Sequence, residues 1–122
     1  MTRNLEILQR HLADLVRSGA CASDDAWLAN VAQSTGLLVV RECVAAWREL
    51  ILRRACPLTA ARLEARGEFR PAVARLLRRE CPMYFRDLAL AFLGDASTHA
   101  DPAVSDAALY ERDQIERAAL AA

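Results

Sequence analysis

The sequence predicts an all-α fold: a single-domain, compact helical bundle of about six or seven helices. Hydrophobic residues make up 54% of the 122 residues and charged residues 26%, which is typical of a globular domain. Apolar residues recur three or four positions apart along most of the chain, which is the spacing of one helix face, and no alternating strand pattern persists. The few glycines and prolines fall between these periodic segments, where helices start and stop.

A first helix is expected from Thr2 to Ser18, with Gly19 ending it. A narrow apolar stripe follows this helix and consists of leucines spaced three and four residues apart: Leu5, Leu8, Leu12 and Leu15. Helices use such a stripe with charged flanks for self-association, so these leucines are candidate partner- or dimer-binding residues. A second helix is expected from an N-cap at Ser23 to about Ser34.

The longest element is expected from Leu37 to Ala55. Its apolar stripe is wide, which is typical of a central core helix, so Trp47 is expected in the core. Tyr84 and Phe85, on a later helix, are expected there too, in preference to a stacking platform for bases.

The phrase Leu-Arg-Arg-x-Cys-Pro occurs twice, at residues 52–57 and 77–82. Paired arginines suit the end of a helix, and a proline suits the first position of the next one. Cys56 and Cys81 are therefore expected near N-caps. The repeat predicts two similar helix–Cys-Pro–helix units in the middle of the chain.

The last helix is expected to begin at Asp101-Pro102, since aspartate caps a helix and proline fits its first position. Its apolar stripe is thin, which predicts a peripheral helix. The expected organisation is one helical domain over residues 1–122, with a core bundle at 1–95 and a connector plus peripheral helix at 96–122.

The net charge is zero but unevenly distributed. Residues 41–86 carry eleven arginines and five acids, whereas residues 87–122 carry two arginines and seven acids. Because the whole chain is neutral, internal pairing between these segments is expected in preference to a polyanionic partner.

All 16 cations are arginine, which indicates a bacterial source of high GC content and excludes Schiff-base chemistry and a phosphate-loop lysine. No long apolar run or signal peptide is evident, so a cytoplasmic protein with reduced cysteines and no membrane association is expected. His11 and His99 have no metal-ligand spacing to any cysteine, and no catalytic constellation is evident. We therefore expect no catalysis, no metal and no cofactor.

Residues 58–79 resemble a bacterial helix-turn-helix: an alanine-rich helix, a glycine turn and a basic second helix. In that family the second helix lies in the major groove of DNA. The resemblance implies a nucleic-acid-binding role for the arginines of this segment, namely Arg70, Arg75, Arg78 and Arg79, with Ala72 facing the DNA. The turn is one residue short for the family, and the alternative is an ordinary helical hairpin.

The Cys-Pro dipeptide also resembles the haem regulatory motif, which implies that Cys56 or Cys81 would ligate ferric haem. A helix N-terminus and neighbouring arginines would lower the pKa of such a thiol. The competing interpretation, which we prefer, treats both cysteines as small buried hydrophobic residues.

The sequence therefore predicts a small regulatory or adaptor protein that acts by binding another protein. An anti-activator, a chaperone and an adaptor all fit this prediction, and a homodimer is expected. A helix-turn-helix regulator of DNA is the first alternative, and a haem-responsive regulator is the second.

Overall fold

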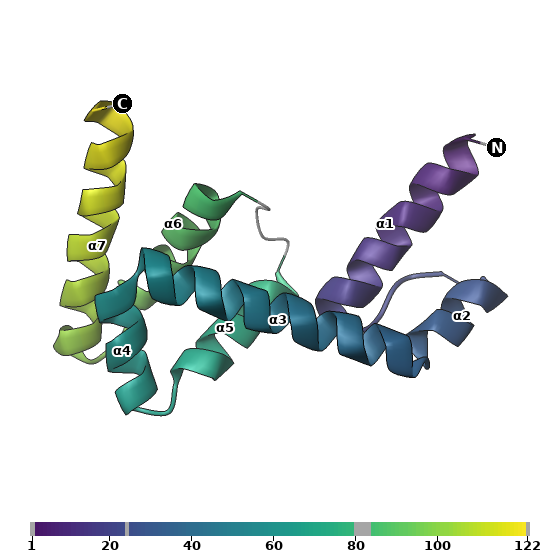
Figure 1. Cartoon of the computed structure of the whole chain (residues 1–122), viewed down its shortest axis with the longest axis horizontal. Helices are drawn as coiled ribbons and strands as arrows, with labels where there is room; N and C mark the ends of the chain where they lie inside the picture. Colours follow the sequence, from purple (N-terminus) through teal and green to yellow (C-terminus); the bar gives the residue numbers. More distant parts are fainter. Residues whose placement is uncertain (1, 24, 80–83, 122) are drawn as a thin grey trace. The chain divides into compact units, whose positions relative to one another are not determined.

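The computed structural model describes residues 2–23, 25–79 and 84–121, and over these ranges it is all-α (Figure 1). Seven helices occur in the described ranges: α1 (Thr2–Ser18), α2 (Ala26–Ala32), α3 (Thr35–Ala55), α4 (Pro57–Ala65), α5 (Phe69–Arg78), α6 (Phe85–Ala96) and α7 (Pro102–Ala121). The predicted fold class is confirmed. None of the described helices is long and apolar enough to cross a lipid bilayer.

The residues group into two compact units, Met1–Ala46 and Trp47–Ala122, so the division falls inside α3. One helical domain over residues 1–122, with a core bundle at 1–95, stays a prediction. Large apolar side chains are exposed in the centre of α3. Val40 and Trp47 are 47% and 61% exposed.

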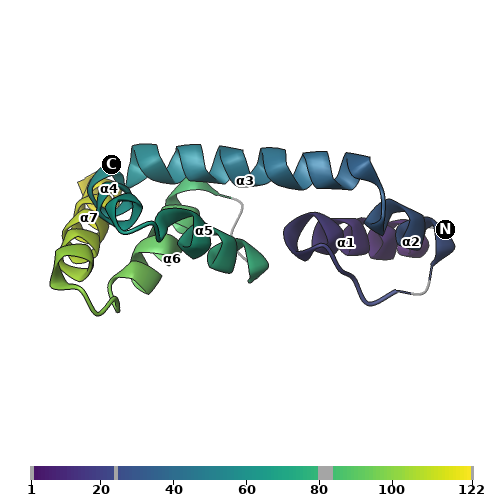
Figure 2. The ribbon, with the colours of Figure 1, turned by 90° about the horizontal axis from the view of Figure 1, so that it is seen from below.

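The N-terminal unit contains α1, α2 and the first part of α3. Its core consists of buried Leu15, Leu28 and Leu37, with Leu8 and Leu12 packed against them. Figure 2 shows α1 and α2 next to each other in this unit. The leucine stripe of α1 therefore packs in large part within the unit.

The helix boundaries in the N-terminal unit differ from the prediction at two caps. Asp25, and not Ser23, caps α2, because its carboxylate accepts hydrogen bonds from the backbone of Trp27 and Leu28. Ser34 does not belong to α2; its hydroxyl accepts a hydrogen bond from the Leu37 backbone at 3.1 Å, which caps α3. A serine can end one helix or begin the next, and only the chain path decides between the two.

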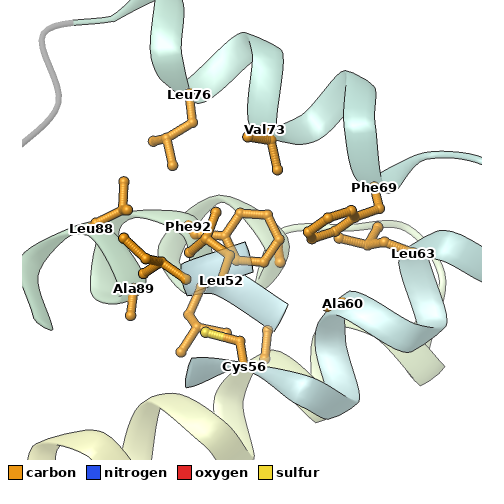
Figure 3. Packing of buried hydrophobic residues seen from close by; sticks show 14 of the residues in the cluster. Leu52, Cys56, Ala60, Leu63, Phe69, Val73, Leu76, Leu88, Ala89 and Phe92 are labelled. Atoms are coloured by element: carbon orange, nitrogen blue, oxygen red, sulfur yellow. The ribbon is translucent and has the colours of Figure 1, made fainter. Parts of the chain in front are cut away.

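The C-terminal unit has the larger core, built from the end of α3 and from α4 to α7 (Figure 3). Phe69 and Phe92 form its aromatic centre, with ring centroids 5.9 Å apart in an edge-to-face arrangement. The Arg53 guanidinium lies 4.8 Å from the Phe69 ring centroid and covers one side of this pair.

Helix α7 is an integral part of this unit, although its thin stripe predicted a peripheral helix. Val104, Ala107 and Ala108 are buried, and α7 packs against α4 and α6 (Figure 2). Small side chains let helix backbones approach closely, so a short stripe of alanine and valine is enough to dock the helix.

The first Cys-Pro corner has the predicted geometry. Cys56 occupies the N-cap of α4 and Pro57 its first turn. The backbone of Cys56 donates to Leu52, the last turn of α3, and accepts from Ala60 of α4. The second corner, with Cys81, lies outside the described residues.

Candidate functional site

A hollow of about 410 Å³ lies on the N-terminal unit between α1 and α2. We call it the α1–α2 groove, and it is lined by Leu5, Ile7, Leu8, His11, Ser23, Asp25 and Leu28. Its lining is largely apolar. Hollows of this composition accept apolar side chains of a ligand or partner.

The rim and floor of the groove differ sharply in exposure. Leu5 and Ile7 at the rim are 53% and 43% exposed, whereas Leu28 in the floor is 1% exposed. His11 contributes a buried Nδ1 atom that has no hydrogen-bond partner among the described residues. Burying a polar atom without a partner is costly, which sets His11 apart from the apolar residues of the lining.

The four stripe leucines of α1 divide between this groove and the internal core. Leu5 lies at the groove, and Leu8 contributes to both groove and core. Leu12 is half-buried against the core, and Leu15 is fully buried in it. Ile7 was missed by the sequence analysis because it lies off the leucine stripe, one position before Leu8.

The helical pair expected from the helix-turn-helix resemblance is present as α4 and α5, joined by a turn in which Gly67 has a φ of +71°. All four predicted arginines are exposed: Arg70, Arg75 and Arg78 in α5, and Arg79 directly after it. These arginines do not form a purely cationic surface, because carboxylates lie next to two of them, Arg70 and Arg79. Ala72 is half-buried and lies against the core cluster.

Carboxylates lie close to the first and last of these arginines. Arg70 lies 3.6 Å from Glu49 of α3, and Arg79 is ion-paired with Asp95 of α6. Elsewhere Arg66 pairs with Asp101 at 2.9 Å, a second link between the basic middle and the acidic C-terminal segment. The internal charge pairing expected from the sequence is thus present at these positions.

Cys56 is fully buried, and its sulfur points into the core cluster (Figure 3). Burial, with the negative charge of Glu111 adding to it, raises the pKa of the Cys56 thiol to about 12. These effects outweigh the helix N-terminus and the arginines, which were expected to lower that pKa. Haem ligation by Cys56 would require the thiol to leave the core and to lose its proton, so its burial disfavours the haem alternative at this residue.

Glu111 of α7 was missed by the sequence analysis. Its carboxylate is buried and accepts hydrogen bonds from the backbone of Leu58 and Thr59, at 3.1 and 2.7 Å, and from the Thr59 hydroxyl at 2.6 Å. Cys56 provides no side-chain cap for α4, so Glu111 caps the helix from a distant part of the chain. No local sequence signal marks this role.

Large apolar side chains are also exposed on the C-terminal unit. Trp47, Tyr84 and Phe85, which were expected in the core, are 61%, 78% and 53% exposed. Leu58 and Tyr110 are exposed as well, and the Leu58 backbone contacts Glu111, the neighbour of Tyr110. Tryptophan, tyrosine and phenylalanine are residue types enriched at protein interfaces.

The described residues contain no group of three or more histidine, cysteine or acidic side chains able to hold a metal ion. No protein-family model matches the sequence, and neither the curated proteins nor the solved structures contain a significant match.

Proposed function

We propose that this chain is a small cytoplasmic regulatory or adaptor protein of bacterial type, which acts by binding proteins and not by catalysis. The observation that carries this proposal is the α1–α2 groove, where exposed Leu5 and Ile7 stand above a buried leucine floor. An anti-activator, a chaperone and an adaptor would all need such a surface.

A second copy of the chain is the occupant that we favour for the groove. A two-fold dimer pairs the same patch on both subunits, so each copy must offer both a projecting side chain and a hollow. The N-terminal unit has both, because Leu5 and Ile7 project and the groove receives. A helix whose apolar face enters a hydrophobic groove is a recurrent mode of protein recognition.

The exposed apolar side chains of the C-terminal unit would then bind the larger partner. Trp47, Leu58 and Tyr110 are of the residue types that contribute to protein interfaces, and tryptophan and tyrosine often dominate their binding energy. This arrangement assigns self-association to one unit and regulation to the other.

Affinity purification of the tagged chain from its native host tests the regulatory half of the proposal. We expect a partner protein in stoichiometric amount, and its loss in a Trp47→Ala, Tyr110→Ala variant that stays folded by circular dichroism. An Arg112→Ala variant is the control, because Arg112 lies on the same helix as Tyr110 and is neither aromatic nor a large apolar residue. Recovery of the partner with both variants alike would contradict this assignment.

DNA binding is the rival function, supported by the exposed arginines of α5. It requires DNA retardation at low salt that weakens steeply as salt is added and is lost in an Arg75→Ala, Arg78→Ala variant. Absence of retardation of any duplex at low salt would remove this rival.

A further inference from the structure

A second hollow, of about 610 Å³, lies within the C-terminal unit among α4, α5, α6 and the turn that follows α6. We call it the arginine cavity. Its volume falls within the range of small-molecule sites, roughly 300–1,000 Å³. Three arginines line it, namely Arg75 and Arg78 of α5 and Arg79, which follows that helix.

The base of the arginine cavity is apolar. Leu63, Phe92 and Ala96 line it, and all three belong to the buried core cluster. The cavity therefore combines an apolar surface, fit for a hydrocarbon or aromatic body, with a cationic rim.

The charged side chains at the rim of the arginine cavity are mostly positive. Among the described residues, the cavity lining carries three arginines and one acid, Asp95, a formal charge of +2 when His99 is counted as uncharged. Asp95 is ion-paired with Arg79, and Arg75 makes no ion pair or hydrogen bond with the described residues. An incoming anion can therefore bind Arg75 without displacing any of the described residues.

His99 forms a fixed part of the wall. Its Nδ1 accepts a hydrogen bond from the Asp101 backbone at 2.9 Å, so its Nε2 carries the proton and donates to Glu68, 2.7 Å away. Both ring nitrogens are occupied, which holds the turn after α6 in place. The arginines, and not His99, are therefore the groups of this cavity that can bind an anion.

We propose that the arginine cavity binds a phosphate monoester of an apolar or aromatic group. A phosphate monoester carries a charge of about −1.5 to −2 near pH 7, which matches the formal charge of the rim. Arginine guanidinium groups bind phosphate through paired, charge-assisted hydrogen bonds. The apolar body lies on Leu63 and Phe92, and the phosphate lies between Arg75 and Arg78. This proposal does not depend on the protein-binding function.

Calorimetric titration of the full chain with 1-naphthyl phosphate tests the proposal, with 1-naphthol, 1-naphthoate and inorganic phosphate as comparison probes. We expect one site per chain, with the ester binding at least about tenfold more tightly than naphthol or phosphate alone, because each of these lacks one of the two contacts. Naphthoate is expected to bind more weakly than the ester. Equal binding of the ester and naphthol would overturn the proposal.

Three single variants locate the site. Arg75→Gln should weaken binding of the ester about tenfold, the cost of one charge-assisted contact. Asp95→Asn should strengthen it, because the substitution removes a negative charge from the rim and releases Arg79. Arg70→Gln is the matched control, since Arg70 lies on the same helix outside the cavity, and it should leave the affinity unchanged.

Equal weakening by Arg75→Gln and Arg70→Gln would show nonspecific attraction to α5 and would overturn the assignment. Displacement of the ester by duplex DNA at lower concentration than by any small phosphate would also overturn it, in favour of a nucleic-acid ligand. Circular dichroism of each variant separates loss of binding from loss of fold.

Discussion

Replacing Glu111 by alanine removes the side-chain cap at the N-terminus of α4. Three hydrogen bonds end on this carboxylate, from the backbone N–H groups of Leu58 and Thr59 and from the Thr59 hydroxyl. Thr59 is fully buried, so its two donors cannot turn to water. The Leu58 side chain is exposed, so water can replace the carboxylate at its N–H at least in part.

The size of the effect follows from these three bonds. Each unsatisfied buried donor costs about 1–2 kcal/mol, and the more accessible Leu58 N–H adds about 0.5 kcal/mol. Removing a buried charge recovers part of this cost. We expect Glu111→Ala to lower the free energy of unfolding by about 3 kcal/mol, a large share of the stability of a small domain.

Urea unfolding followed by helical circular dichroism measures this quantity. The control is Glu116→Ala on the same helix, where the exposed ion pair with Arg112 is worth less than about 0.5 kcal/mol. A loss below about 1 kcal/mol for Glu111→Ala, or one equal to that of the control, would refute the capping role.

Two further predictions concern titratable groups. Maleimide labelling with peptide mapping should modify exposed Cys43 quickly and Cys56 only on unfolding. The reason is that Cys56 is buried and its pKa is raised to about 12. Fast labelling of Cys56 in the folded protein would contradict this prediction, because it would show that the helix corner opens. The hydrogen bond from His99, together with the interaction with Arg66, lowers the pKa of Glu68 from its ordinary value of 4.5. The Glu68 carboxylate therefore stabilises the folded state above pH 4.5. This contribution to stability is lost as the pH falls through the lowered pKa. Urea midpoints at neutral and acid pH should therefore differ less in Glu68→Gln than in the wild type; an unchanged difference would contradict the assignment.

Local rules predicted the parts of the fold that local chemistry controls. The Cys56-Pro57 corner has the predicted form because proline constrains both its own backbone and that of the preceding residue. The end of α1 at Ser18 likewise follows from Gly19, whose φ of +81° favours glycine. These features need no knowledge of distant residues.

Burial and long-range contacts were not predictable in the same way. Trp47 and Tyr84 are apolar enough for a core, but whether a side chain is covered depends on which elements pack over it. Glu111 lies 52 residues from Thr59 in sequence, so no local pattern could identify it as the cap of α4. The thin stripe of α7 was misjudged because alanine gives a weak hydrophobic signal and yet permits close packing.

The candidate sites also combine features that local sequence predicts with features that depend on long-range packing. Leu5 and Leu8 were identified from their periodicity and lie together at the α1–α2 groove. Arg75 and Arg79 were identified from their charge, but the apolar base beside them comes from α4 and α6. Their common cavity depends on tertiary packing that the pattern of charges does not contain.

Sedimentation equilibrium over a range of protein concentrations tests the central claim, self-association through the α1–α2 groove, most directly. We expect twice the mass of one chain for the wild type and the mass of one chain for Leu5→Glu, whose charge would be buried at the dimer contact. Leu109→Glu, at an exposed leucine of α7, should remain dimeric. A single-chain mass for the wild type at all concentrations, or a dimer that Leu5→Glu leaves intact, would contradict the account.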